Sequence, residues 1–357
     1  MSYPMPPESI LSLIRRGTVI PASPLALNSR REFDPCRQTA LMRYYCQAGA
    51  GGVAVGVHTT QFAIRNPEVD LFETVLQTCA QALDEYTRQS GRPVIKIAGI
   101  VGRTAQAARE AETALSHGYH AGLLSLSAFG SAPISEMIDH AEEIARLIPL
   151  FGFYLQPSVG GRVLPLEFWR KFVLIPNVVA IKIAPFNRYQ TFDVIRAVAE
   201  EGLENDIALY TGNDDHIITD LITPWTFTVS GNRKILRIRG GLLGQWAVGT
   251  KRAVEMLTEI HDLLDTGSDI HPDMLKRNVE LTDANAALFD AAHQFRGVIP
   301  GVHEVLRRSG LLEGIWTLNP DEGLSEGQFD EIERVLHTYP HLFDDTFIEE
   351  NRDSWLT

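Results

Sequence analysis

Eight short apolar segments recur along the first two-thirds of the 357-residue chain, and helix-forming stretches separate them. Consecutive segments begin 26 to 42 residues apart, which leaves room for one strand, one crossover helix and the return to a parallel strand. The predicted strands are residues 17–22, 52–57, 94–99, 120–126, 150–156, 178–184, 206–211 and 242–248. Several are apolar throughout, as parallel strands buried on both faces are. Because no glycine-rich turn follows the first strand, this pattern favours a closed (β/α)8 TIM barrel over an open doubly wound sheet.

Two further regions depart from the strand–helix alternation. Residues 225–240 contain two strand-like runs about a glycine turn, which predicts a hairpin inserted before the eighth strand. From residue 250 onward the pattern is wholly helical. The chain is therefore predicted to form a barrel over residues 1–249, with the inserted hairpin, and a C-terminal helical region over 250–357. Thr191 is predicted to cap the helix that follows strand 178–184.

Composition places the chain among ordinary globular proteins, with 45% hydrophobic and 22% charged residues. Its net charge of −13 would repel phosphate backbones and anionic lipids, so we expect neither nucleic-acid nor membrane binding. The longest mostly apolar stretch, residues 147–155, is too short to span a bilayer. The start of the chain lacks a leader pattern, and the three cysteines form no CxxC pair. We therefore expect a cytoplasmic protein.

Polar residues near the carboxyl ends of the predicted strands are the candidates for chemistry, because barrel active sites lie at that face. These candidates are His58, Thr59, Thr60, Ser127, Tyr154, Lys182, Asn213 and Asp214. Histidines and acidic residues elsewhere in the chain form no HExxH motif, and there is no cysteine cluster, so we expect no metal.

Lys182 is the most informative of these candidates, since its own strand offers no acidic residue to pair with it. Burial without a partner lowers the pKa of a lysine and yields the neutral amine that attacks a carbonyl carbon to form a Schiff base. The alternative is an ion pair with an acid from a neighbouring strand. Lys96 stands in nearly the same local sequence, VIKIAG against AIKIAP, and periodicity alone does not choose between the two lysines.

Tyr154 and the segment His58–Thr60 each allow two interpretations, one functional and one structural. A phenol at the end of the fifth strand would lie close to the end of the sixth and would relay protons, but a tyrosine in an apolar strand also serves as core. Residues 58–60 supply hydroxyls, an imidazole and backbone N–H groups suited to a carboxylate. The alternative is a polar loop whose hydroxyls cap the backbone.

Lys182 follows the segment Tyr154–Pro157 and lies 28 residues after the tyrosine. This pattern resembles the YxxP…K signature of the dihydrodipicolinate synthase / N-acetylneuraminate lyase family. Residues 48–62 resemble the family's AGxxG…GTTGEF segment, and Gly212-Asn213-Asp214 resembles its GdD segment. The resemblance implies a cofactor-independent lyase of the class I aldolase type. In it Lys182 forms an imine with pyruvate or another 2-oxo acid, and Tyr154 relays protons.

The resemblance also assigns substrate binding and assembly. Thr59, with His58, Thr60 and Asn213, would hold the substrate carboxylate, the second substrate would be an aldehyde, and the chain would form a homotetramer or dimer. This sequence departs from the family pattern at His58, at Gln61 in place of a glutamate, and at Phe129, where the synthases place a tyrosine. Sugar-acid aldolase, hydratase-aldolase and dihydrodipicolinate synthase activities therefore stay open, as does a non-catalytic barrel that binds 2-oxo acids.

Overall fold

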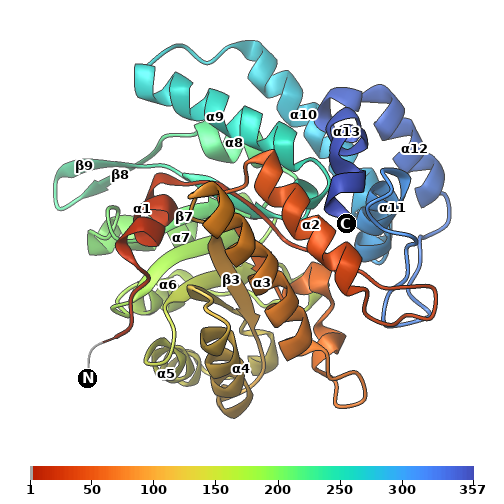
Figure 1. The fold of residues 1–357 in the computed structure, drawn as a ribbon. Coiled ribbons are helices and arrows are strands. Elements are labelled where there is room, and N and C mark those ends of the chain that lie inside the picture. Colours follow the sequence, from red (N-terminus) through yellow and green to blue (C-terminus); the bar gives the residue numbers. More distant parts are fainter. Residues whose placement is uncertain (1–2) are drawn as a thin grey trace. The chain divides into compact units, whose positions relative to one another are not determined.

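The computed structural model describes residues 3–357 (Figure 1). The chain divides into two compact units. Unit 1 comprises Met1–Thr18 and Ile97–Leu242, and unit 2 comprises Val19–Lys96 and Leu243–Thr357. Two of the three boundaries fall inside strands, β3 (Ile95–Ile100) and β10 (Gly240–Leu243), and the third lies just before residue 19. Within the described residues, no helix is long and apolar enough to cross a membrane.

Unit 1 contains a run of parallel strands connected by helices. Its strands are β4 (Ala121–Leu124), β5 (Leu150–Leu155), β6 (Val178–Ala184) and β7 (Ala208–Thr211), with most of β3 and β10. Its helices are α1 (Glu8–Arg16), α4 (Thr104–Ser116), α5 (Ile134–Ala145), α6 (Leu166–Phe172), α7 (Arg188–Glu201) and α8 (Ile217–Ile222). Each strand from β3 to β7 pairs in parallel with the next one along the chain, and β7 pairs with β10.

Unit 2 combines the first strands with the C-terminal helices. Its strands are β1 (Val19–Pro21), β2 (Gly52–Val55) and the first residues of β3. Its helices are α2 (Pro35–Ala48), α3 (Phe72–Ser90), α9 (Thr250–Thr266), α10 (Pro272–Leu288), α11 (Val298–Arg308), α12 (Gln328–Thr338) and α13 (Asp345–Trp355). Residues 250–357 contain no strand, as the sequence predicts. A division of the chain at residue 249 stays a prediction.

The eight-stranded sheet has the order β1-β10-β7-β6-β5-β4-β3-β2. Together with the alternation of strands and helices, this order gives a (β/α)8 barrel with C-terminal helices and confirms the predicted fold class. All eight predicted strands are present. The eighth begins at Gly240 rather than at residue 242, and residues 245–247 form a 3-10 helix instead of continuing the strand. The sequence pattern missed this start because the strand begins with two glycines, which are uncommon in strands. A glycine is needed at 240, since a Cβ there would lie 2.5 Å from the carbonyl oxygen of Thr18.

The predicted hairpin is present as β8 (Trp225–Val229) and β9 (Asn232–Leu236), an antiparallel pair that ends before residue 240. It packs on α7 through Phe192, whose ring centroid lies 5.1 Å from that of Phe227. The predicted cap of α7 is wrong: Asn187, not Thr191, accepts the hydrogen bonds of the first-turn N–H groups through its side chain. Thr191 lies inside the helix instead, and its hydroxyl accepts a hydrogen bond from Asn213.

Candidate active site

Lys182 lies near the carboxyl end of β6, the end at which barrel enzymes place their chemistry. It pairs in register with Phe153 of β5, and its Nζ lies 4.8 Å from the centroid of the Phe153 ring. On the other side, a Cβ at Gly212 would lie 2.6 Å from the Cε of Lys182. Position 212 must therefore be a glycine for the lysine to adopt this course.

The environment of Lys182 raises the fraction of its neutral form. The side chain is partly buried and forms no ion pair within residues 3–357. Burial lowers the pKa of Lys182 to about 8, and the negative charge of Asp214 opposes that shift. With such a pKa, roughly one lysine in ten is a neutral amine at pH 7, about 300 times the fraction of an ordinary lysine. The neutral amine is the form of lysine that can attack a carbonyl carbon.

Lys96 is held in an ion pair, with an acid from a helix rather than from a neighbouring strand. It is the second residue of β3, and its Nζ lies 2.6 Å from Oδ1 of Asp84 on α3. Only 6% of the Lys96 side chain is exposed. Of the two lysines with matching local sequences, Lys96 is therefore the one held in an ion pair.

The structure does not bring Tyr154 to Lys182. Tyr154 pairs in register with Ile183, so it projects from the opposite face of the sheet to Lys182 and Phe153. Its hydroxyl accepts a hydrogen bond from the N–H of Leu164 at 3.0 Å, and its ring packs against Trp169 of α6 at 5.3 Å between centroids. Burial raises the pKa of Tyr154 to about 12. In this arrangement the phenol is packed against Trp169 and bonded to the Leu164 backbone, and a relay role for Tyr154 stays a prediction.

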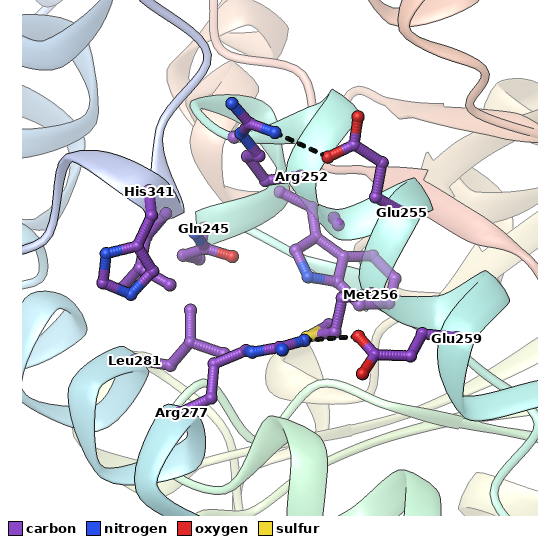
Figure 2. A pocket seen from close by; sticks show the side chains of 12 residues that line it. Gln245, Arg252, Glu255, Met256, Glu259, Arg277, Leu281 and His341 are labelled. Atoms are coloured by element: carbon purple, nitrogen blue, oxygen red, sulfur yellow. Dashed lines mark hydrogen bonds and ion pairs between the residues drawn. The ribbon is translucent and has the colours of Figure 1, made fainter. Parts of the chain in front are cut away.

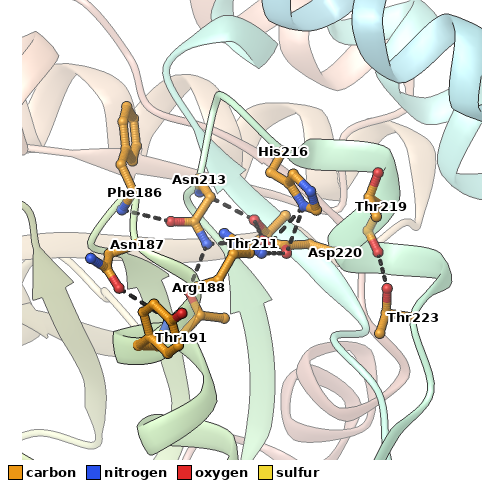
Figure 3. Close-up of polar contacts among 11 residues, drawn as sticks. Phe186, Asn187, Arg188, Thr191, Thr211, Asn213, His216, Thr219, Asp220 and Thr223 are labelled. Atoms are coloured by element: carbon orange, nitrogen blue, oxygen red, sulfur yellow. Dashed lines mark hydrogen bonds and ion pairs between the residues drawn. The ribbon is translucent and has the colours of Figure 1, made fainter.

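Asn213 follows β7 and is fully buried in a polar network (Figure 3). Its Oδ1 accepts a hydrogen bond from the N–H of Phe186 at 3.0 Å. Its Nδ2 donates to Asp220 at 2.9 Å and to Thr191 at 3.3 Å. The amide therefore ties the loop after β6, which contains Phe186, to the end of β7. Both amide groups of Asn213, to which the resemblance gives a role in substrate binding, are thus engaged within the protein.

Asp220 of α8 is the centre of this network and was not selected from the sequence. The carboxylate is completely buried and accepts hydrogen bonds from Thr211, Asn213 and the Arg188 guanidinium. Burial alone would raise its pKa, but the hydrogen bond from His216, the charge of Arg188 and the remaining hydrogen bonds hold the pKa of Asp220 below its usual value. The available signal was an aspartate inside the apolar run IITDLI.

Asp214 is the second residue whose importance the sequence understated. It adjoins Asn213 after β7, and its charge is the one that acts on the pKa of Lys182. A carboxylate so placed favours protonated nitrogen, whether ammonium or iminium.

In unit 2, residues 58–60 form a 3-10 turn that follows β2. The hydroxyl of Thr59 donates to the carbonyl of Ala22 at 2.9 Å, and that of Thr60 donates to the carbonyl of Ser23 at 2.7 Å. Thr60 also accepts a hydrogen bond from the N–H of Gly56 at 3.0 Å. Both hydroxyl protons are engaged by backbone, as the capping alternative predicts. The His58 ring stands 5.8 Å from that of Phe62.

Phe129, in unit 1, is buried after β4 and packs against the His140 ring at 4.5 Å between centroids. The Arg103 guanidinium lies 4.7 Å from the centroid of the Phe129 ring. His140 in turn forms a hydrogen bond with Thr104, and burial lowers the pKa of His140 to about 4. The residues around Phe129 are thus a packed aromatic cluster with a neutral histidine at ordinary pH.

A separate cavity of about 280 Å³ lies within unit 2 (Figure 2). Arg252 and Arg277 line it, and each is held by a glutamate, at 2.7 Å from Glu255 and 2.6 Å from Glu259. The charges of this lining are balanced by its own residues. Within the described residues there is no group of three or more histidine, cysteine, aspartate or glutamate side chains placed to hold a metal ion.

Comparison of the sequence with known protein families gives no match, and neither does comparison with curated proteins. The fold, by contrast, is that of solved (β/α)8 lyases. A dihydrodipicolinate synthase from Cyanidioschyzon merolae with lysine bound superimposes with a TM-score of 0.70 at 19% identity, over 92% of this chain and 99% of that one. N-acetylneuraminate lyase from Fusobacterium nucleatum gives 0.68 at 14%, over 91% and 99%.

A third neighbour is a prophage protein of the dihydrodipicolinic acid synthase family from E. coli K12, in complex with pyruvate. It superimposes with a TM-score of 0.71 at 14% identity, over 91% of this chain and 98% of that one. The structural neighbours thus come from the same family as the resemblance found in the sequence.

Proposed function

We propose that this protein is a lyase of the class I aldolase type that forms an imine between Lys182 and a 2-oxo acid such as pyruvate. The observation that carries the proposal is the position of Lys182, at the carboxyl end of β6 with no ion pair within residues 3–357. The neutral amine attacks the carbonyl carbon, and loss of water from the carbinolamine gives the imine. Removal of a proton from the adjacent carbon then gives an enamine, which adds to an aldehyde; the reverse sequence cleaves the adduct.

We assign proton handling near Lys182 to Asp214 in the first place. Its charge acts directly on the pKa of the lysine, and a carboxylate there favours the protonated imine over the neutral one. Tyr154 stays the relay implied by the resemblance, and it would have to exchange its hydrogen bonds with Leu164 to serve as one. The two assignments predict different variants to be affected.

For the substrate carboxylate we propose the segment that contains His58, Thr59 and Thr60. The threonine hydroxyls donate to backbone carbonyls, and the N–H of Thr60 donates to the carbonyl of Val57 at 3.0 Å. The backbone N–H of Thr59 is therefore the donor that we assign to the carboxylate. Asn213 orients the loop after β6 in this scheme. No metal or organic cofactor takes part. An aldehyde as second substrate, a homodimer or homotetramer, and a cytoplasmic location complete the proposal.

The test is reductive trapping. The protein is incubated with pyruvate and borohydride, digested, and mapped by mass spectrometry, with Lys182→Ala and Lys96→Ala in parallel. We expect an adduct on the peptide that contains Lys182, its loss in Lys182→Ala and its retention in Lys96→Ala. Absence of an adduct with pyruvate and with a series of longer 2-oxo acids, in protein shown to be folded, would overturn the lyase. Saturable binding of those acids without trapping would then identify a non-catalytic barrel.

A further inference from the structure

The inserted hairpin helps to form a cavity of about 240 Å³ in unit 1, whose lining comes from three parts of the chain. Arg15 belongs to α1, Ala208 and Leu209 begin β7, and Arg237 and Arg239 follow β9. The cavity lies at the amino end of β7, whereas Gly212 and the Lys182 side chain that it contacts lie past the carboxyl end of that strand. It is therefore a site distinct from the proposed active site.

Positive charge dominates this lining. Arg15, Arg237 and Arg239 all border the cavity, and the one lining carboxylate, Glu204, is held by Lys234 at 2.9 Å. The nearest acid to Arg15 is the exposed Asp206 at 3.5 Å, a weak pair because 62% of that side chain is exposed. The cavity thus differs from the one in unit 2, where each lining arginine has its own glutamate.

Arg15 and Arg237 each have N–H donors that the surrounding described residues leave unused. Arg237 donates to the carbonyl of Ile222 at 3.0 Å and makes no ion pair within residues 3–357. The Nε of Arg15 is buried and has no hydrogen-bond partner among the described residues. Burial and the charge of Arg239 lower the pKa of Arg237. The effect of Arg239 is the one expected when two positive charges lie close together.

The backbone fixes this arrangement from both sides. The N–H of Arg239 donates to the carbonyl of Leu209 at 2.8 Å, so the segment after β9 is joined to β7. A Cβ at Gly17 would lie 2.1 Å from the carbonyl oxygen of Arg239, so α1 ends in close contact with the same segment. The arginines that line the cavity are therefore attached to backbone segments that pack closely against one another.

We propose that this cavity binds a small phosphorylated metabolite through its phosphate group, with Arg15 and Arg237 as the principal ligands. A guanidinium offers paired donors that match phosphate oxygens. The volume is below that of pockets for drug-sized molecules, which limits the ligand to a phosphate and a short carbon skeleton. The overall charge of −13 repels anions at long range, so binding must come from these close contacts. This gives the hairpin a role that the proposed lyase activity does not require.

Inorganic phosphate is the probe for the test, measured by titration calorimetry and by the thermal midpoint, against chloride at equal ionic strength. Malonate serves as the carboxylate comparison. We expect saturable phosphate binding, a rise in the thermal midpoint, and binding weaker by about tenfold or more in both Arg237→Gln and Arg15→Gln. Arg233→Gln is the matched control, because Arg233 lies on the same strand β9 and does not line the cavity.

The control must bind phosphate as the unaltered protein does, and all variants must retain their circular dichroism spectrum. Absence of saturable phosphate binding would overturn the proposal. Equal loss in Arg233→Gln would show general charge effects and overturn it as well, and tighter binding of malonate than of phosphate would overturn the assignment of ligand class. None of these results depends on imine formation, so failure here is distinguishable from failure of the lyase.

Discussion

Lys96 and Lys182 occupy parallel strands of one barrel, within nearly identical stretches of sequence, and their surroundings differ in two respects. Lys96 is at the amino end of β3 and contacts Asp84 on α3. Lys182 is near the carboxyl end of β6, where its neighbours are the Phe153 ring and the glycine at 212. The comparison shows that position along the strand and the element opposite decide whether a lysine in such a sequence is held in an ion pair.

The largest contrast between the two lysines is expected in catalysis. Enamine formation exchanges the methyl protons of pyruvate for deuterium in D2O, so the exchange can be followed by NMR without knowledge of the aldehyde. Lys182→Ala removes the nucleophile and should lower the exchange rate by roughly a thousandfold or more. Lys96→Ala, which leaves β6 intact, should retain the rate within about tenfold. Equal rates in the unaltered protein and in Lys182→Ala would place the reactive amine elsewhere.

Two acids should differ next in their effect on stability: Asp220, at the centre of the network after β7, and Asp84, the partner of Lys96. Asp220, which secures Asn213 and the end of β7, has no exposed surface, whereas 54% of the Asp84 side chain is exposed. Asp220→Ala leaves the partly buried Arg188 without its partner, and we expect the free energy of unfolding in urea to fall by about 2–3 kcal/mol. Asp84→Ala should lower it by about 1 kcal/mol or less. A larger loss in Asp84→Ala would reverse the ranking of the two sites.

Stability should respond with opposite sign to removal of each lysine. At pH 7, Lys182→Met should raise the free energy of unfolding by about 1–2 kcal/mol, because the folded state no longer buries an unpaired ammonium. Lys96→Met should lower it by about 1 kcal/mol through loss of the pair with Asp84. Urea denaturation of both variants measures this difference.

The same difference appears in the pH dependence of stability. The folded pKa of Lys182, about 8, is below its ordinary value of 10.5, so the unfolded chain binds more protons between these two pH values. The free energy of unfolding attributable to Lys182 therefore rises with pH across that window, and the rise should be missing in Lys182→Met. A rise of the same size in the variant would assign it to other groups.

Much of the barrel was predictable from the sequence, because runs that are apolar on both faces identify buried parallel strands without knowledge of their partners. The sequence also shows that neither Lys182 nor Lys96 has an acid in its own strand, but it does not show which of them is paired, because Asp84 comes from α3. What stayed undetermined depends on contacts between distant residues. The face to which Tyr154 points follows from the β5–β6 register, which shifts at Leu150/Phe151, and nothing local reports that shift.

Two polar residues illustrate the same limit on a smaller scale. Thr191 and Asn187 are both acceptable helix caps by residue type, and the choice of Asn187 follows from where the chain leaves β6. Asp220 is a single aspartate in a short apolar helix, and its importance becomes visible only when Thr211, Asn213 and Arg188 converge on it.

The smallest expected effect separates the two candidates for proton handling. Asp214 stabilises the protonated form of Lys182, so Asp214→Asn should lower the pKa of the lysine further, by roughly half a unit to one unit. The pH midpoint of deuterium exchange into pyruvate should then move below its value in the unaltered protein. Tyr154→Phe should leave that midpoint and the exchange rate nearly unchanged, because the hydroxyl is bound to Leu164 on the opposite face of β5. Loss of exchange in Tyr154→Phe, with the midpoint of Asp214→Asn unmoved, would restore the tyrosine as the relay and show that its contact with Leu164 is given up when substrate binds.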